Sequence, residues 1–261
     1  MVDSTDFLTA MIEVMPLERR WSARALANLR AALRRYWKVQ SARAVNALNA
    51  TSRLLKESEE DDVVSSIAAS KAAEELSKAV REIAGVAISQ GVADGAAESL
   101  LELSFSLRHP MAADYIERAG ADLVTRIDET TRESLRTLLK EATENGWSYG
   151  KTSREIRRMF NGFAGRSPLR HIRDRGELVV TTEIGNAYSE GKLIFGQDME
   201  ARGLRMEKRW ITVGDDRVDQ NECSPNAGQG WIPLSREFQS GHARPLAHPG
   251  CRCAMIMRSA P

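Results

Sequence analysis

The residues with the clearest chemical potential are three cysteines and a histidine close to two of them. His248, Cys251 and Cys253 lie within the stretch HPGCRC, and Cys223 lies upstream in DDRVDQNECSPNAG. Three thiols and one imidazole form a complete tetrahedral ligand set for zinc. Because four protein ligands leave no coordination position for water or substrate, the pattern predicts a structural zinc site rather than a catalytic one.

Other assignments of these residues stay open at the level of the sequence. His242, Asp216 and Asp219 compete as metal ligands. Alternatively, the cysteines are small buried hydrophobic residues and His248 bonds a backbone carbonyl. A disulfide between Cys251 and Cys253 is not expected, because side chains two residues apart on a strand share a face with Cα atoms about 7 Å apart.

Motifs that would indicate an enzyme are missing from the sequence. There is no pair of histidines at helical spacing with a glutamate and no Gly-rich phosphate loop. The letters Gly-x-Ser-x-Gly occur once, at residues 146–150, but there one helix ends and the next begins, whereas a nucleophile elbow needs a strand-to-helix turn. Asp215, Asp216 and Asp219 could hold the metal of a nuclease, but aspartates in turns usually bond their own backbone. The sequence therefore predicts a protein that is not an enzyme, with a nuclease as the alternative.

The elements that must position the cysteines follow Gly203. The stretch RMEKRWITV alternates apolar and polar residues as a half-buried strand does, and WIPL and CAMIM are further strand candidates. Glycine, proline, asparagine and serine dominate between them. Such a region buries little apolar surface and needs another source of stability. We predict a small β-rich, loop-rich domain over residues 204–261, stabilised by zinc.

Helical periodicity dominates before Gly203. One helix is expected to bury Leu26, Leu29, Leu33, Trp37, Gln40, Ala44 and Leu48. A second should run from about Asp62 to the region of Gly91 and Gly95, and a third from Ala112 to Asn145. The chain is thus predicted to be mainly α, an elongated helical body with an N-terminal region over 1–109 and a helical domain over 110–203.

The end of the third helix and the next two helices are also indicated. Gly146 suits the position just after a helix, and Thr152 with Glu155 fits a capping box at the next helix start. From Ser167 to about Glu200 a further helix is expected.

The N-terminal helix carries an unusual charge. Between Pro16 and Lys56 there are ten basic residues against one acid, with Trp21, Tyr36 and Trp37 interleaved. Arg30, Arg34, Arg35 and Lys38 are the candidate nucleic-acid-binding residues, because each lysine or arginine that contacts a phosphate releases counterions. An acidic protein surface, an anionic membrane surface or a solvated helix face are the other readings of this charge.

The bulk properties of the sequence narrow the class of protein. The net charge of +1 and the apolar content of 42% are ordinary for a soluble protein. No signal peptide is recognisable in the first residues, and no window has the run of about 18 apolar residues that a membrane span needs. An odd number of cysteines argues against a secreted disulfide framework. We expect a soluble protein in a reducing compartment, with no membrane partner.

The C-terminal stretch resembles the phage head morphogenesis family, the Mu F-like minor head proteins of tailed phages. The residues that carry the resemblance are Trp210 and Thr212, the turn Asp216-Arg217-Val218, Cys223, and the closing His248 to Cys253. The segment ADLVTRIDETTRESLRTLLKEATENGWSYGKTSREIRRMF and the helix TTEIGNAYSEGKL are similar to the section that precedes it in the family. Many relatives have a further cysteine near the position of Asp219, so here His248 is needed to complete four ligands.

The resemblance covers roughly residues 110–258 and implies a function. It implies a minor structural protein of the virion, inside the capsid at the portal vertex, that assembles in the bacterial cytoplasm. The expected partners are the portal protein, the major capsid or scaffold protein, and double-stranded DNA during packaging or ejection. A DNA-binding zinc module outside any virion is the alternative.

Overall fold

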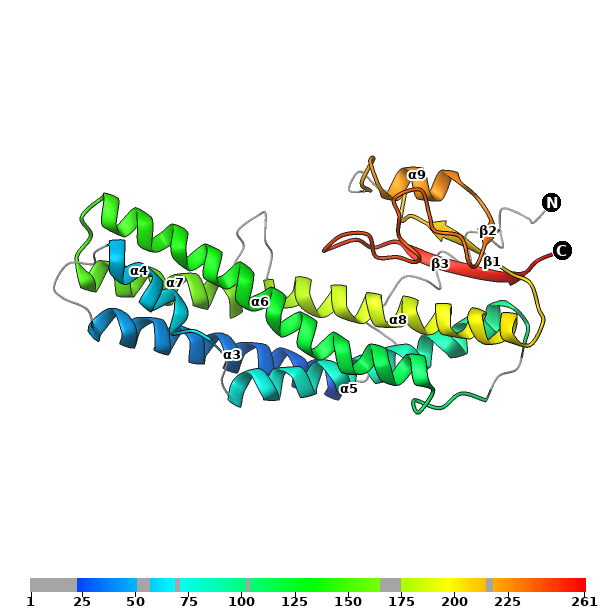
Figure 1. Cartoon of the computed structure of the whole chain (residues 1–261), viewed down its shortest axis with the longest axis horizontal. Helices are drawn as coiled ribbons and strands as arrows, with labels where there is room; N and C mark the ends of the chain where they lie inside the picture. Colours follow the sequence, from blue (N-terminus) through cyan, green and yellow to red (C-terminus); the bar gives the residue numbers. More distant parts are fainter. Residues whose placement is uncertain (1–22, 51–56, 69–70, 102–103, 165–174, 215–217) are drawn as a thin grey trace. The chain divides into compact units, whose positions relative to one another are not determined.

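The computed structural model describes residues 23–50, 57–68, 71–101, 104–164, 175–214 and 218–261. The structure is 67% helical and 7% strand, which confirms a mainly α protein with a small C-terminal sheet (Figure 1). The elements are α3 (Ala23–Ala50), α4 (Glu57–Ser65), α5 (Lys71–Glu98), α6 (Pro110–Glu144), α7 (Tyr149–Ala164), α8 (Arg175–Ala201), β1 (Met206–Ile211), α9 (Cys223–Gly228), β2 (Ile232–Pro233) and β3 (Ala254–Ser259).

Two compact units share these elements. The bundle unit comprises residues 27–81 and 118–180, and the described part of the sheet unit consists mainly of residues 82–117 and 181–261. Helices α5, α6 and α8 each contribute residues to both units. The division of the chain into 1–109, 110–203 and 204–261 follows composition along the sequence, whereas contacts group segments that are distant in sequence. That division and the elongated body stay predictions.

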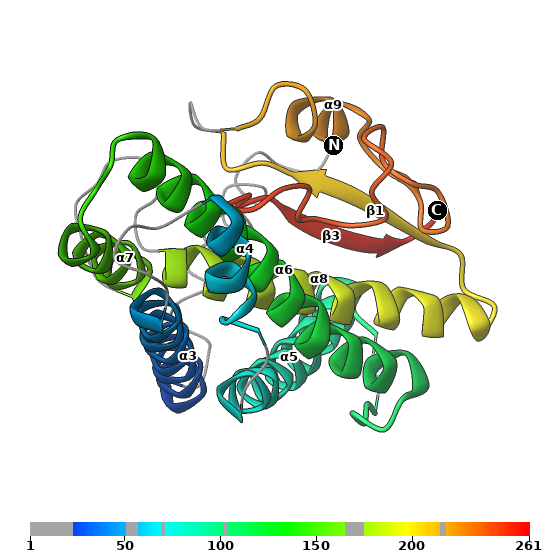
Figure 2. The same cartoon turned by 60° about the vertical axis from the view of Figure 1, so that its left-hand side comes forward.

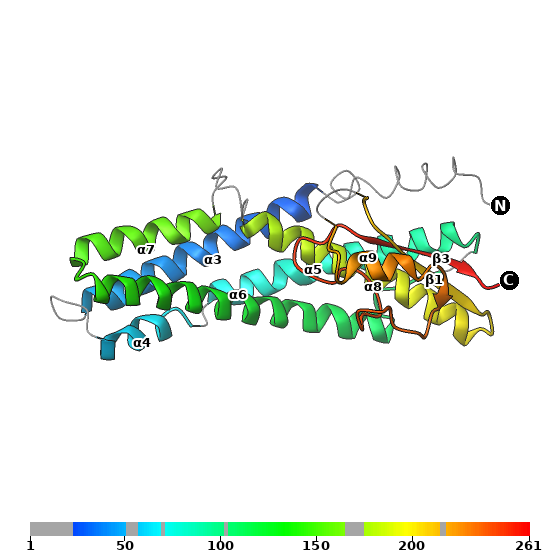
Figure 3. The ribbon, with the colours of Figure 1, turned by 90° about the horizontal axis from the view of Figure 1, so that it is seen from above.

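Helix α3 buries the face that the sequence indicates. Leu26, Leu29, Leu33, Trp37, Gln40, Ala44 and Leu48 are all buried. Helices α3 and α7 lie side by side in Figure 3, and the Trp37 and Phe163 rings have centroids 5.8 Å apart. Asp128 of α6 accepts hydrogen bonds from the Tyr36 hydroxyl and from Gln40 Nε2, the latter at 2.6 Å. This carboxylate gives the Tyr36 hydroxyl and the Gln40 amide N–H an acceptor on a buried helix face.

Two helix boundaries differ from the prediction. The expected helix from about Asp62 is wrong, because α4 ends at Ser65 and α5 begins at Lys71. The Ser66 hydroxyl donates to the Val63 carbonyl at 2.6 Å, a local bond that competes with helical continuation. Helix α5 also runs through Gly91 and Gly95 to Glu98 instead of ending between them.

The turn between α6 and α7 confirms one expected cap and corrects the other. Gly146 has φ of +60°, Trp147 N–H donates to Ala142 O at 2.8 Å, and Gly146 N–H donates to Thr143 O at 3.2 Å. This is a Schellman motif that ends α6. The capping box at Thr152 is wrong, because α7 already begins at Tyr149 and Thr152 lies buried in its first turn.

The sheet unit stacks its elements in layers. The three strands form an antiparallel sheet of order β2-β1-β3, with Trp210 of β1 opposite Met255 of β3. In Figures 1 and 2 the sheet lies between α9 on one side and α8 on the other, with α5 beyond α8. The predicted strands at RMEKRWITV, WIPL and CAMIM are confirmed in place, whereas helix α9 was not foreseen.

Two glycines allow α5 and α8 to touch within the sheet unit. A Cβ on Gly91 would lie 2.1 Å from the Tyr188 carbonyl oxygen, and one on Gly191 would lie 2.2 Å from the Ile88 carbonyl oxygen. Both contacts are with backbone, which cannot yield as a flexible side chain can. Gly91, which the sequence placed near a helix end, and Gly191 therefore serve close helix packing.

The described helices were also searched for membrane spans. None of them combines the length and the apolar character that crossing a bilayer requires.

Candidate metal centre

Three cysteines from two distant parts of the sequence converge in the sheet unit. The sulfurs of Cys223, Cys251 and Cys253 all lie within 4.8 Å of one another, and the three residues are at most 8% exposed. Cys223 Sγ lies 3.6 Å from Cys251 Sγ, close to the separation of about 3.8 Å between two thiolates on one tetrahedral zinc ion. All three are free thiols. This buried cluster could hold a metal ion.

Local structure on each side of the cluster sets the position of the thiols. Cys223 is the first residue of α9, and Asp219 shapes the turn before it by accepting hydrogen bonds from the N–H groups of Asn221 and Glu222, both at 2.8 Å. Cys251 and Cys253 lie immediately before β3. The pairing of β3 with β1 therefore fixes the position of Cys251 and Cys253, and the turn at Asp219 fixes that of Cys223.

His248 lies at the edge of the cluster. Its Nε2 is 3.5 Å from Cys223 Sγ, and its Nδ1 is 3.1 Å from the Pro249 carbonyl oxygen. A carbonyl accepts only, so Nδ1 carries the proton and Nε2 has a free lone pair toward the sulfur. This is the tautomer that a metal ligand requires, although His248 does not belong to the tight group that the three sulfurs form.

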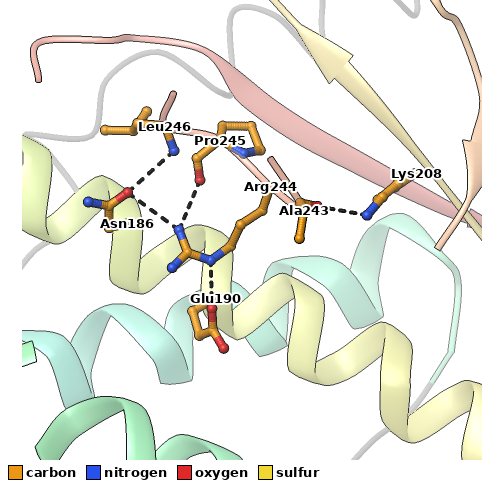
Figure 4. Close-up of polar contacts among 7 residues, drawn as sticks. All are labelled: Asn186, Glu190, Lys208, Ala243, Arg244, Pro245 and Leu246. Atoms are coloured by element: carbon orange, nitrogen blue, oxygen red, sulfur yellow. Dashed lines mark hydrogen bonds and ion pairs between the residues drawn. The ribbon is translucent and has the colours of Figure 1, made fainter. Parts of the chain in front are cut away.

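The loop that carries His248 is anchored on α8. Figure 4 shows the Arg244 guanidinium over this helix, where its Nε donates to Glu190 Oε2 at 2.5 Å. Asn186 Oδ1 accepts from Leu246 N–H at 3.4 Å in the same view. Further along, Gly250 N–H donates to Thr182 Oγ1 at 3.2 Å. These bonds hold residues 244–250 on one face of α8 and thereby limit where His248 and Cys251 can lie.

Lys208 of β1 holds the same loop from the sheet. Its ammonium donates to the Ala243 carbonyl at 2.7 Å (Figure 4). The same ammonium lies 5.1 Å from the Phe238 ring centroid. Burial lowers the pKa of Lys208 to about 8, and the carboxylates of Glu237 and Glu200 act in the opposite direction. The sequence did not indicate that Lys208 and Arg244 support the cluster. The alternating pattern of a strand and the composition of a loop do not show which distant carbonyl or carboxylate a side chain will bind.

A second buried lysine ties the sheet to the helices. Lys192 of α8 is fully buried, and its Nζ lies 2.5 Å from Glu98 Oε1 and 2.8 Å from the Met255 carbonyl oxygen. Burial raises the pKa of Glu98, and the Lys192 charge acts against that rise. Because Met255 follows Cys253 by two residues, this ion pair holds the strand that carries the thiols against α5 and α8.

Trp210 supplies an unused hydrogen-bond donor beside the thiols. Its side chain is 0% exposed, and its Nε1 has no hydrogen-bond partner of good geometry among the described residues. Trp210 faces Met255 across the sheet, and Cys253 lies two residues before Met255 on the same face. The indole N–H is close enough to lower the pKa of Cys253, against larger effects that raise it. A thiolate at Cys253 would give this orphaned donor an acceptor.

The pKa values of the three thiols shift in different directions. A hydrogen bond from Cys253, the largest cause, lowers the pKa of Cys251 to about 5. Burial raises the pKa of Cys223 to about 11, and the bond to Cys251 together with burial raises that of Cys253. One thiolate therefore fits in the cluster without a cation, while full ionisation of three neighbouring thiols requires a positive charge among them.

The competing ligands indicated by the sequence fall outside this group. His242 Nδ1 lies 2.8 Å from the Ser240 hydroxyl in a separate turn. The Asp219 carboxylate is occupied by backbone N–H groups, which hold its pKa below the usual range. Asp215 and Asp216 lie outside the described residues.

The four candidate nucleic-acid-binding residues lie on α3 of the bundle unit. Arg34, Arg35 and Lys38 are exposed, whereas Arg30 is half-buried. Arg35 Nε is 3.3 Å from Glu75 Oε2 of α5. The exposed face of α3 therefore presents three of the four predicted basic residues, and one of these three, Arg35, already pairs with an acidic residue.

Comparison of the chain with protein-family models, curated proteins and solved structures gives no match.

Proposed function

We propose that this protein is a minor head protein of a tailed phage, a structural component inside the capsid that associates with the portal. The observation that carries the proposal is the convergence of Cys223, Cys251 and Cys253. These residues belong to the motif on which the family resemblance rests. A structural role follows in this proposal if His248 completes the ligand set, because four protein ligands leave no coordination position for a substrate.

In this proposal, the cluster holds one structural zinc ion, with His248 as the fourth ligand. Thiolate sulfurs and a neutral imidazole nitrogen are the donors that zinc prefers. The distances from Cys223 Sγ to Cys251 Sγ and to His248 Nε2, 3.6 and 3.5 Å, are those of ligands around one small ion. Hydrogen bonds within the cluster and from Trp210 can stabilise one thiolate but not three. A bound cation would stabilise the others.

The zinc site is tested by elemental analysis of the purified chain. We expect about one zinc per chain, and we expect Cys253→Ser to lose the metal and to increase amide exchange after Gly203, because metal binding contributes directly to folding. Ser235→Ala, an exposed change in the same region, is the control. A native chain that is fully folded without metal would refute the zinc site.

The role in the virion is tested in the phage or prophage that encodes the chain. An affinity-tagged copy should sediment with procapsids that contain portal protein and should be recovered from mature particles. Deletion of the gene should reduce the yield of infectious particles while tails still assemble. Recovery of the tagged protein only from the soluble fraction, with normal particle yield, would exclude a minor head protein.

Packaged DNA is the second proposed partner, through the basic face of α3. The exposed Arg34, Arg35 and Lys38 support this contact, since clustered cations on one helix face gain affinity for DNA by releasing counterions. This contact is not base-specific, because it relies on phosphates alone.

A further inference from the structure

The bundle unit has a groove that the proposed function does not use. It lies between α6 and α7, with a volume of about 700 Å³, and it is lined on α6 from Thr130 to Glu141. That stretch spans about three helical turns, or roughly 17 Å. All of its lining residues belong to the bundle unit, so the groove is defined without reference to the sheet unit.

Large apolar side chains form much of the lining. Leu138 of α6, Trp147 of the connecting turn, and Met159 and Phe163 of α7 are all half-buried, which leaves part of each accessible. An accessible row of aliphatic and aromatic side chains along two helices is the usual receptor surface for the apolar face of a third helix.

Short hydroxyl side chains complete the α6 side of the groove. The hydroxyls of Thr130, Ser134 and Thr137 donate to carbonyls of their own helix, those of Arg126, Thr130 and Glu133, at 2.8 to 3.0 Å. These donors are therefore already satisfied and need no polar partner from a ligand. The side chains are also short, which allows another helix to approach α6 closely.

The α6 edge of the groove is acidic, whereas on the opposite side the Lys151 ammonium of α7 lies 3.7 Å from the centroid of the lining Trp147 ring. Glu133 and Glu141 of α6 line the groove, and Glu155 of α7 lies on the other side. Among the described residues, no basic side chain pairs with Glu133 or Glu141, whereas Glu155 lies 3.6 Å from exposed Arg158. An apolar centre between two unpaired carboxylates fits a helix with an apolar face and basic flanks.

We propose that this groove binds a basic amphipathic helix of about three turns from another protein. The apolar face of that helix would contact Leu138, Trp147, Met159 and Phe163, and its lysines or arginines would pair with Glu133 and Glu141. The two unpaired carboxylates of α6 favour this occupant over an acidic helix or a nucleic acid, which they would repel.

The test uses the full chain and a dye-labelled synthetic peptide of leucine and lysine, patterned as an amphipathic helix. Fluorescence anisotropy should show saturable binding, and the same peptide with glutamate in place of lysine should not bind. Glu133→Lys with Glu141→Lys should weaken binding by about tenfold, because two favourable charge pairs become repulsive. Both positions are exposed on a helix, where lysine is well tolerated.

The matched control is Glu74→Lys with Asp122→Lys, two exposed acids of the same unit that do not line the groove. This variant should bind within twofold of the parent chain, and a photo-crosslinker on the peptide should label residues 130–163. Equal losses in both variants would show nonspecific attraction and overturn the proposal. So would equal binding of the two peptides, no binding at all, or dimers of the parent chain that the groove variant abolishes, since the last result assigns the groove to a second copy.

Discussion

Trp210 shows how a single residue connects the fold to the cluster. It packs edge-on against Phe238, with ring centroids 5.0 Å apart, and keeps a buried N–H without a good acceptor beside Cys253. Hydrogen bonds to metal-bound thiolates stabilise their negative charge. Loss of a group that hydrogen-bonds to a metal ligand commonly reduces metal affinity by about 10- to 100-fold. The packing and the polar contribution of this side chain can be separated by mutation.

Trp210→Phe should retain a ring against Phe238 but lose the donor. We expect zinc affinity, measured by competition with a chelator, to fall by about tenfold. The thiolate-to-metal absorption band of the cobalt-substituted protein should shift as well, which a purely packing role would not cause. Trp231→Phe is the control, because Trp231 stacks on Arg258 and not on the cluster. Equal effects of the two substitutions would contradict the assignment.

The burial of Lys208 predicts how the stability of the protein depends on pH. Its pKa is about 8 in the folded protein against an ordinary value of 10.5, because burial disfavours the ammonium. Between these values the unfolded chain binds more protons than the folded chain, so the free energy of unfolding should rise as pH rises, by up to about 3 kcal/mol. Urea unfolding at pH 7 to 10 measures this rise.

Lys208→Met should remove that dependence, since methionine fills a similar volume without a titratable group. Lys78→Met, at an exposed position of α5, should leave the slope of stability against pH unchanged. An identical slope in the parent protein and in Lys208→Met would show that burial does not lower the pKa of Lys208.

At the scale of elements, the crossing of α5 and α8 depends on glycine. Each of Gly91 and Gly191 faces a backbone carbonyl of the other helix at a distance that excludes any side chain. The helices also carry the groups that hold the C-terminal loop and strand, including Glu98, Glu190 and Lys192. Separation of this pair should therefore disturb both the helix packing and the support of the thiols.

Gly191→Ala should lower the free energy of unfolding by about 2 kcal/mol or more, because overpacking against backbone requires the helices to move apart. Gly162→Ala is the matched control within α7, where a Cβ would meet nothing within 4 Å. That change should instead stabilise by about 0.5–1 kcal/mol through helix propensity. Thermal unfolding of both variants distinguishes the cases, and a neutral Gly191→Ala would rule out the tight crossing.

At the scale of the whole molecule, the two units carry different chemistry. The described basic face of α3 and the acidic groove between α6 and α7 lie in the bundle unit, and the thiol cluster lies in the sheet unit. Contacts of the molecule with DNA and with a protein helix are thus proposed for one unit, and metal binding for the other. Each can be altered by mutations that leave the other unit unchanged.

Arg34→Glu with Arg35→Glu should weaken binding of double-stranded DNA and flatten the dependence of affinity on salt, because fewer counterions are released. Arg154→Glu with Arg157→Glu makes the same change in net charge at exposed positions of α7 and should have a smaller effect. Fluorescence anisotropy at several salt concentrations measures both. DNA affinity that is unchanged in the α3 variant would leave its basic face as a solvated surface.

The sequence by itself determined the helical character of the chain, the buried face of α3, the end of α6 at Gly146 and the strands of the sheet. These features follow from local periodicity and from the conformational freedom of glycine. It also selected the three cysteines, because few residue types bind metals. The end of α4 at Ser65 was not predicted, because the residues that follow carry no glycine or proline to mark a helix end in the sequence.

Only the tertiary structure decided which of these residues meet. It brought Cys223 to Cys251 and Cys253, left His242 and Asp219 to shape separate turns, and placed Trp210, Lys208 and Arg244 as supports. It also gave Gly91 a packing role in place of a helix end, opposite Gly191 of α8. Such contacts join residues far apart in sequence, and their energies depend on burial and on partners that no local pattern records.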